Sequence, residues 1–365
     1  MLFALYKGVT TQFYQFYKKT GKTRKEKEKM KKILSLLLIL ALALSLVACG
    51  GSEDAGDDAV ENVVLHFGST QGTTHAWYEA AQNFAANVAA AEAGLEIQID
   101  FGGVHGSDKE HAEAVQNGAL DMYLGSTVGF DAIVTSIGFV NLPYVVTTYD
   151  DVDSLIYNGW MGEVLKADAE AAGFNILGIT DCDFRWISNS KNPIESGADI
   201  AGLKMRVPES PMFLEFFSNL GAVPTSMAFT ELPSALQQQT VDGQDNGPTL
   251  SYPNGLHQFN KYWTKSNHSF ASAVIAVNPA RFDSLSADQQ AALQSAVDQM
   301  VIDCKTLLRE DVGEMSELMV TEGGCEVIDP TEQFQADMLE AAQKVWASDS
   351  ATGNYNQDAV AKIRG

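Results

Sequence analysis

The residues that could hold a small anion lie between positions 202 and 246, and Arg206 is the first of them. Arg206 belongs to a short predicted strand over 204–208, which a predicted helix over 211–220 and a polar Asp-Gly-Gln-Asp-Asn turn at 242–246 follow. A guanidinium at a strand edge presents a planar fork of N–H donors, which matches a carboxylate and is always charged. The segment therefore predicts a carboxylate site.

Cations are scarce in this chain, which gives Arg206 added weight. The chain has 24 Lys and Arg residues against 47 Asp and Glu residues. Ten of these cations and two of these anions precede Cys49, so 14 cations and 45 anions remain, a net charge of −31, and five of the remaining cations are arginines. Nucleic acids and anionic lipid surfaces are repelled by such a field. We expect no nucleic-acid partner, and an anion must be bound by a few local donors.

Residues 30–48 predict a lipoprotein signal peptide. A basic start, an apolar run of about 15 residues and small residues precede Cys49. The run is shorter than the roughly 20 residues that span a bilayer, which argues against the alternative of an uncleaved anchor. We expect Cys49 to carry the lipid and to tether the protein to the outer face of the cytoplasmic membrane, outside the cytoplasm.

The segments on either side of the signal peptide are not expected to fold. Residues 1–29 end in Arg-Lys-Glu-Lys-Glu-Lys, which an almost pure purine run would encode, as in a ribosome-binding site. We hypothesise that Met30 is the true start; a peptide from residues 1–29 in the proteome would contradict this. Residues 49–61 are acidic and contain glycine, and they predict a disordered tether.

Strand and helix patterns alternate from residue 63 onward. Strands are predicted over 63–67, 95–101 and 119–124, with helices over 75–93 and 108–116 between them. This order favours an α/β fold with parallel strands covered by helices.

A single long helix is predicted over about 287–321. Ser286 and Gln289 form a capping-box signature, and apolar residues then recur at spacings of three and four. A helix of about 35 residues far exceeds the mean of about 11–12, so it either crosses between two domains or runs along both. Cys304 lies on the apolar stripe of this helix and is expected to be a buried thiol. The alternative is a disulfide between Cys304 and Cys325, and the sequence does not decide between the two.

Several motifs in the same order resemble the solute-binding subunits of TRAP (tripartite ATP-independent periplasmic) transporters, the DctP-like family. The resemblance runs from Val63 to about Pro330, and its motifs are 202–246, Arg185–Ile194, Gly106–Glu110, Gly118–Asp121 and Asn141–Tyr144. It implies a two-domain periplasmic-binding-protein-like α/β fold with a ligand cleft between lobes and a long domain-bridging helix. We expect domain I to comprise 62–182 plus 272–311, and domain II 183–271 plus 312–365.

The resemblance also implies roles for individual residues. The family's equivalent of Arg206 pairs with the substrate carboxylate, whereas the alternative is an ion pair with Glu209. Arg185 matches a second arginine that lies near the ligand or braces the site, and the alternative is a cross-domain ion pair. Asn246 matches an asparagine that hydrogen-bonds the ligand, with a turn residue as the alternative.

Three further positions follow from the same resemblance. Phe229 is expected to pack on the ligand body or to belong to the core, and Thr70 and Ser126 to present hydroxyls from strand-end loops. The family branch that binds its ligand through a metal has Glu-Trp at the positions of Asp245-Asn246, so we expect neither a metal nor a cofactor. For Trp186 two roles stay open: its ring could be a platform for the ligand, or it could be an ordinary packing residue.

These observations lead to an expected function. The protein is interpreted as a monomeric, lipid-anchored receptor that captures a small organic acid, such as a C4-dicarboxylate or sugar acid, and delivers it to the small and large membrane subunits of a TRAP transporter. The alternatives are an ABC-type solute-binding lipoprotein and a secreted α/β hydrolase. No Gly-x-Ser-x-Gly, His/acid pair or metal-ligand spacing supports the hydrolase, so we expect no enzymatic activity.

Overall fold

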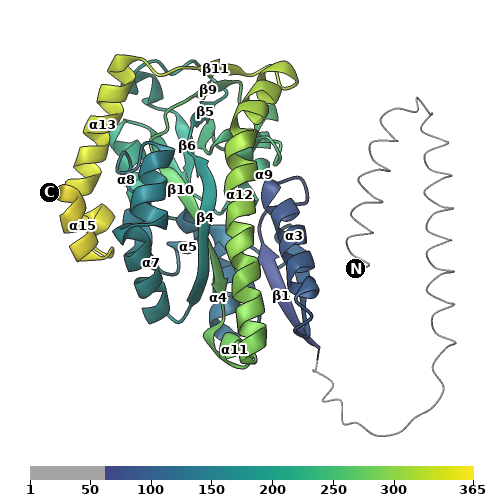
Figure 1. Cartoon of the computed structure of the whole chain (residues 1–365). Coiled ribbons are helices and arrows are strands. Elements are labelled where there is room, and N and C mark those ends of the chain that lie inside the picture. Colours follow the sequence, from purple (N-terminus) through teal and green to yellow (C-terminus); the bar gives the residue numbers. More distant parts are fainter. Residues whose placement is uncertain (1–61) are drawn as a thin grey trace, which may run out of the picture. The chain divides into compact units, whose positions relative to one another are not determined.

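The computed structural model describes residues 62–365. The predicted N-terminal extension, signal peptide, lipidated Cys49 and tether lie outside the described residues. The described part contains a five-stranded and a six-stranded β-sheet. In Figure 1 the strands of the six-stranded sheet lie toward the top and β1 of the five-stranded sheet toward the bottom.

The five-stranded sheet has the order β2-β1-β3-β10-β4. Strand β1 is parallel to β2 and β3, and β10 is antiparallel to β3 and β4. In the first four residues of β2 the burial alternates, because successive side chains of a strand point to opposite faces. The three strands predicted first are confirmed, with small shifts at their ends. The strands are β1 (Val63–Ser69), β2 (Leu95–Phe101), β3 (Met122–Ser126), β4 (Asn175–Phe184) and β10 (Phe270–Val277).

The six-stranded sheet consists of strands of three or four residues in the order β11-β9-β5-β8-β6-β7. They are β5 (Ile187–Asn189), β6 (Lys204–Val207), β7 (Val223–Ser226), β8 (Gly243–Asp245), β9 (Tyr262–Thr264) and β11 (Glu326–Ile328). The predicted turn at 242–246 is wrong, because most of it is the buried strand β8. Its polar groups are satisfied by antiparallel pairing with β5 and by side-chain partners such as Ser188, whose Oγ accepts from Gln244 Nε2 at 2.8 Å.

Helices cover both sheets. They are α3 (Ala76–Ala90), α4 (Asp108–Asn117), α5 (Thr127–Phe130), α6 (Tyr149–Asp151), α7 (Trp160–Ala171), α8 (Pro211–Asn219), α9 (Leu232–Gln237), α10 (Pro248–Ser251), α11 (Pro279–Asp283), α12 (Ala287–Thr321), α13 (Glu332–Ala347), α14 (Asp349–Thr352) and α15 (Gln357–Arg364). Within residues 62–365, none of the helices combines the length and apolar character that a membrane crossing requires. We call the five-stranded sheet with α3, α4, α5 and α7 the first lobe, and the six-stranded sheet with α8, α9 and α10 the second lobe.

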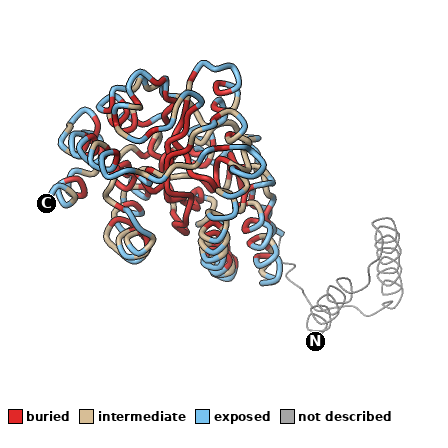
Figure 2. Tube along the Cα trace, turned by 90° about the horizontal axis from the view of Figure 1, so that it is seen from above, coloured by how far each residue is buried: buried red, intermediate tan, exposed pale blue. Residues whose placement is uncertain are grey.

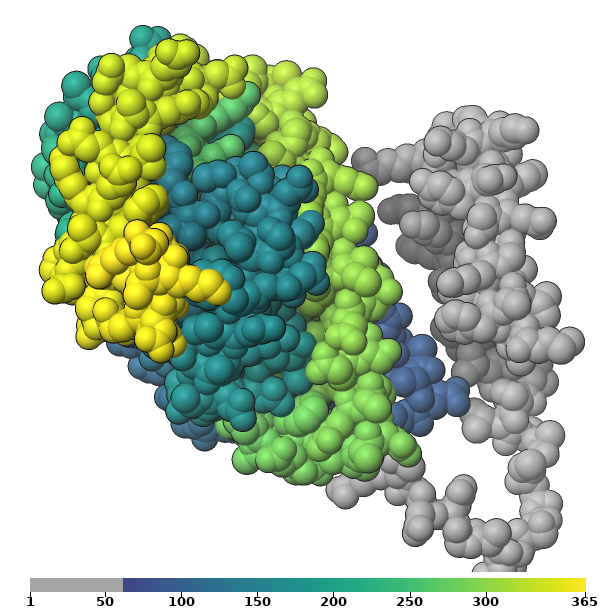
Figure 3. Space-filling view, turned by 60° about the vertical axis from the view of Figure 1, so that its left-hand side comes forward, coloured from purple at the N-terminus to yellow at the C-terminus, as the bar shows by residue number. Residues whose placement is uncertain are grey.

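Helix α12 has the 35 residues that the sequence predicts, and it begins at the predicted capping box of Ser286 and Gln289. It packs on α3 and β4 of the first lobe and on α10 of the second. Figure 1 shows it running along both lobes, and in Figure 3 its green atoms form a continuous strip of the surface. Of the two alternatives for so long a helix, crossing between two domains or running along both, the second therefore describes α12 and the two lobes.

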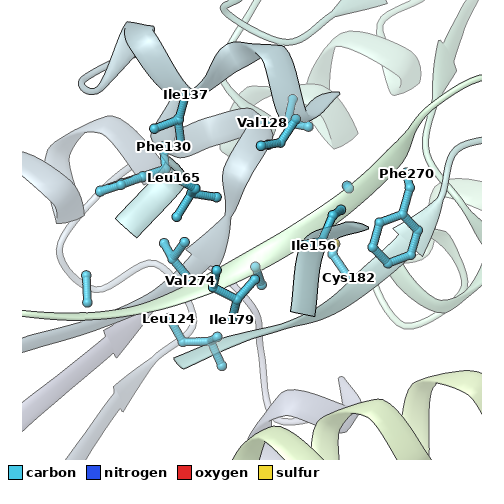
Figure 4. Packing of buried hydrophobic residues seen from close by; sticks show 14 of the residues in the cluster. Leu124, Val128, Phe130, Ile137, Ile156, Leu165, Ile179, Cys182, Phe270 and Val274 are labelled. Carbon is cyan, nitrogen blue, oxygen red and sulfur yellow. The ribbon is translucent and has the colours of Figure 1, made fainter. Parts of the chain in front are cut away.

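The main hydrophobic core continues from the first lobe into the second, where it includes Phe213 and Phe216 of α8. Figure 2 shows buried residues along the central strands, and Figure 4 shows Leu124, Ile179 and Val274 close together. The C-terminal segment returns to the first lobe, where Asn356 Nδ2 donates to Asp168 Oδ1 at 3.0 Å. The domain boundaries given above stay a prediction.

The capping box predicts a measurable stability effect. Ser286 Oγ accepts from the backbone N–H of Gln289 at 3.2 Å, and Gln289 Oε1 accepts from the Ser286 N–H at 3.0 Å. Ser286→Ala should lower the free energy of unfolding by about 1 kcal/mol, because it leaves an N-terminal N–H of α12 without its partner. Urea denaturation measures this loss. Ser286→Asp is the matched control that keeps a cap; equal losses in both variants would contradict the assignment.

Candidate ligand-binding site

One cavity lies between the carboxyl ends of strands from both lobes, and all six predicted ligand residues line it. The space open to the centre of a water molecule is about 50 Å³, several times the ~10–15 Å³ that one water needs. The lining residues are Thr70, Gln71, Trp77, Asp108, Ser126, Val128, Gly129 and Cys182 on one side, and Arg185, Arg206, Pro208, Glu209, Met227, Ala228, Phe229, Asn246 and Leu250 on the other.

Arg206 is placed by strand β6, where it pairs in parallel register with Thr225 of β7. Its side chain is buried, and its Nε and Nη2 both donate to the backbone carbonyl of Met227, at 3.0 and 2.8 Å. Among the described residues no carboxylate lies within salt-bridge distance of Arg206, so the alternative pairing with Glu209 is absent. Burial lowers the pKa of Arg206 to about 10, which still leaves it charged at neutral pH.

Arg185 follows β4 and is also buried, but its charge is balanced. Its Nε and Nη2 donate to the two carboxylate oxygens of Asp245, both at 2.9 Å. Antiparallel pairing of β5 with β8, with Ile187 opposite Asp245, brings the two side chains together. Burial alone would raise the pKa of Asp245, but Arg185 and His268 Nε2 at 3.3 Å outweigh it, so that the pKa is lowered. This geometry makes Arg185 a brace of the cavity wall.

Asn246 and Phe229 form the rest of the second-lobe side. Asn246 comes directly after β8, is buried, and donates through Nδ2 to Gln244 Oε1 at 2.5 Å. Phe229 begins a 3-10 turn (Phe229–Glu231) that precedes α9 and is half-buried at the cavity. This turn leads into α9, where Pro233 lies at the start of the helix.

Thr70 and Ser126 lie at the carboxyl ends of β1 and β3. Ser126 caps α5 by accepting from the Val128 N–H at 3.2 Å. Thr70 Oγ1 donates to Asp108 Oδ1 at 3.1 Å, and Tyr123 OH donates to the same oxygen at 2.5 Å. Both hydroxyls therefore lie at the cavity but already have partners within the protein.

Sequence reasoning missed several lining residues, of which Asp108, Gln71 and Glu209 are the polar ones. Asp108 belongs to a motif that supports the family resemblance, but its pattern indicated only the start of a helix.

Trp186 packs away from the cavity and donates through Nε1 to Asn267 Oδ1 at 2.8 Å, so the interpretation of its ring as a platform for the ligand is not supported. Cys182, Cys304 and Cys325 are buried free thiols. Residues 62–365 contain no group of three or more His, Cys, Asp or Glu side chains that could hold a metal.

Several hydrogen bonds connect the lobes, and two of them involve Gln71 and Asp131. Asn254 Nδ2 donates to Gln71 Oε1 at 2.9 Å, and Ser210 Oγ donates to Asp131 Oδ2 at 2.9 Å. Asp131 is buried, and its other oxygen, Oδ1, has no partner among the described residues. The lobes are therefore in direct polar contact.

Asp131 predicts a pH dependence of stability. Burial raises the pKa of its carboxyl to about 7, although the hydroxyls of Ser210 and Tyr355 oppose this. Between roughly pH 4 and 7 the folded protein therefore keeps a proton that the unfolded chain releases, and stability falls as pH rises, by up to about 1.4 kcal/mol per pH unit. Asp131→Asn, which cannot ionise, should lack this part of the slope. Urea denaturation at pH 5 and 7.5 measures it; parallel slopes in both proteins would contradict the prediction.

Comparisons with known proteins agree with this architecture. Residues 67–352 match the family described as bacterial extracellular solute-binding protein, family 7. DctP of Rhodobacter capsulatus, a C4-dicarboxylate-binding periplasmic protein, is 34% identical over 191 residues, which are 52% of this chain and 57% of that protein. YiaO of Escherichia coli, a 2,3-diketo-L-gulonate-binding periplasmic protein, is 26% identical over 265 residues, or 72% of this chain and 80% of that protein.

Solved structures share the fold. A TRAP periplasmic solute-binding protein from Ralstonia eutropha with bound (S)-2-acetolactate has a TM-score of 0.77 at 25% identity, over 83% of this chain and 98% of that one. A second, from Sulfurospirillum deleyianum with bound succinate, has a TM-score of 0.77 at 22% identity, over 84% and 99%. These likenesses confirm the α/β, two-lobed binding-protein fold. The chain belongs to family 7 of the bacterial extracellular solute-binding proteins, which serve TRAP transporters as extracytoplasmic solute-binding subunits, and it is not an enzyme.

Proposed function

We propose that the protein captures a small organic acid between its two lobes and holds the carboxylate on Arg206. The observation that carries this proposal is a buried guanidinium with one backbone carbonyl as its acceptor, in a cavity to which both lobes contribute. The carboxylates of Asp245, Asp108 and Glu209 favour the charged form of Arg206 from a distance, but none of them is within salt-bridge distance, and desolvating an ion without a contacting partner is costly. A ligand carboxylate would supply that contact and accept charge-assisted hydrogen bonds from the guanidinium.

The related proteins support the ligand class. Their ligands are C4-dicarboxylates, 2,3-diketo-L-gulonate, acetolactate and succinate, all of which carry a carboxylate. The proposal extends to this chain the feature that these ligands share and leaves open the rest of each molecule. Asn246, Phe229, Thr70, Ser126 and Arg185 would then surround the body of the ligand.

Capture would involve a hinge motion of the two lobes. Helix α12 packs on elements of both lobes, and it is our candidate for transmitting the motion to the surface. The closed form would deliver the ligand to the small and large membrane subunits for uptake driven by an ion gradient. In this proposal the lipid on Cys49 holds a monomeric protein at the membrane.

A thermal-shift screen of the purified protein tests this function. Carboxylic acids of several classes are compared with their neutral amides. An acid at about 100 times its dissociation constant should add about 2.7 kcal/mol to the free energy of unfolding and raise the melting temperature, whereas the amide should not. If no acid shifts the melting temperature, or if amides act equally, the proposal is wrong.

A further inference from the structure

We propose that the ligand of this cavity is a compact monocarboxylate with an apolar body, of the branched hydroxy- or oxo-acid kind, in preference to a dicarboxylate or a polyhydroxylated sugar acid. This inference rests on the proposed function, because it assumes that Arg206 holds one carboxylate. It concerns the rest of the ligand, and three features of the cavity wall carry it.

The first feature is the charge of the wall. Of the two arginines that line the cavity, Arg185 is neutralised by a two-pronged ion pair with Asp245, whereas Arg206 has no carboxylate partner among the described residues. Asp108 and Glu209 place two further carboxylates on the wall. A second carboxylate on the ligand would find no free cation there and would be repelled by these anions, so a single negative charge fits the wall.

The second feature is how few hydrogen-bond donors of the wall remain free. The hydroxyl of Thr70 already donates to Asp108, and Ser126 Oγ already accepts the capping bond of α5. Gln71 Oε1 accepts from Asn254 at 2.9 Å, and Asn246 Nδ2 donates to Gln244. The free groups of the wall are mainly acceptors, namely the side-chain oxygen of Asn246 and the carboxylates of Asp108 and Glu209, whereas the Ser126 hydroxyl contacts the Cys182 thiol. With so few free donors the wall can serve one hydroxyl or oxo group, but the oxygens of several sugar hydroxyls would lose their water partners without replacement.

The third feature is the apolar surface that remains. The Trp77 indole N–H donates to the Asp181 carbonyl at 3.1 Å, so the ring offers the cavity an apolar surface. Burial raises the pKa of the Cys182 thiol, which therefore stays neutral. Val128 and Leu250 are buried side chains that complete this wall. Such surfaces favour a branched hydrocarbon body, which gains from leaving water.

A matched ligand series tests the proposal by thermal shift and calorimetry on the purified protein. The series consists of 2-hydroxy-3-methylbutanoate, its 2-oxo analogue, the neutral amide of the hydroxy acid, glutarate and ribonate. We expect the two branched monocarboxylates to bind at least roughly 10-fold more tightly than glutarate or ribonate, since one mismatched group in a closed pocket typically costs 10-fold or more. Tighter binding of glutarate or ribonate overturns the inference and leaves the proposed function intact. If no acid binds, or the amide binds equally well, the proposed function fails as well.

A variant of the wall provides a second test. Val128→Thr keeps the shape of the side chain but adds a hydroxyl, and it should weaken binding of the branched acids by roughly 10-fold. Val134→Thr is the matched control, because Val134 is equally buried in the same lobe but does not line the cavity. Equal affinities in the Val128→Thr variant and the unchanged protein would overturn the apolar-wall argument. If Val128→Thr does not fold, the ligand series on the unchanged protein still decides the inference.

Discussion

Replacing Arg206 by methionine should weaken binding of the organic acid about 30-fold or more, while the ligand-free protein stays as stable as before. Truncating one partner of a buried, hydrogen-bonded charge pair costs roughly 2–5 kcal/mol of binding energy, and each ~1.4 kcal/mol is tenfold. Without ligand the same guanidinium has one carbonyl acceptor and a pKa lowered by burial. Removing it also removes the desolvation cost of a buried charge, which offsets the lost hydrogen bonds and the lost attraction to Asp245, Asp108 and Glu209. Calorimetry and urea denaturation measure the two effects.

Two further variants separate the possible causes. Arg206→Lys keeps the charge but loses the planar fork, so its affinity should also fall strongly. Arg281→Lys is the control, because Arg281 is partly exposed, pairs with Asp121 at 3.0 Å and lies outside the cavity lining. Unchanged affinity in Arg206→Met, or an equal loss in Arg281→Lys, would refute the carboxylate-clamp assignment.

The sequence predicted helix α12 accurately because its signals are local. The capping box and the spacing of apolar residues depend only on neighbours within a few turns. The same holds for β2, whose alternation reflects one buried face. The short strands β5 and β8 carry no such pattern. Three residues are too few to establish a period, and their conformation depends on pairing with each other across the second lobe.

The site residues were predicted mainly from the resemblance to the family, and less from local sequence patterns. All six predicted ligand residues line one cavity, but they come from separate strand ends whose proximity only the fold establishes. The sequence analysis gave a cross-domain ion pair as the alternative for Arg185, but Asp245, in the same predicted domain, was not foreseen as its partner, because a polar Asp-Gly-Gln-Asp-Asn run is typical of a turn. The sequence could not reveal that Asp245 would be buried opposite a guanidinium. That burial distinguishes the roles of the two arginines.

Asp245→Asn should lower the free energy of unfolding by roughly 3–5 kcal/mol, because it leaves the buried guanidinium of Arg185 without its counter-charge. Both side chains are almost fully buried, so solvent cannot replace the lost partner. The pKa of Asp245 is lowered in the folded protein, which means that its contribution is complete above the unfolded value near 4 and is lost as pH falls through the folded pKa. The difference between the two proteins should therefore stay constant from pH 8 to about 5 and shrink in stronger acid.

A double variant separates the loss of a pair from the exposure of a charge. Arg185→Met combined with Asp245→Leu removes both charges, and such replacements of buried ion pairs are often neutral or stabilising. The double variant should therefore recover most of the stability that Asp245→Asn loses, as measured by urea denaturation. If it is as unstable as the single variant, shape and hydrogen bonding of these side chains matter more than charge balance. A loss below about 1 kcal/mol in Asp245→Asn would mean that another acceptor replaces the carboxylate, and the ion pair would then not be what stabilises the cavity wall.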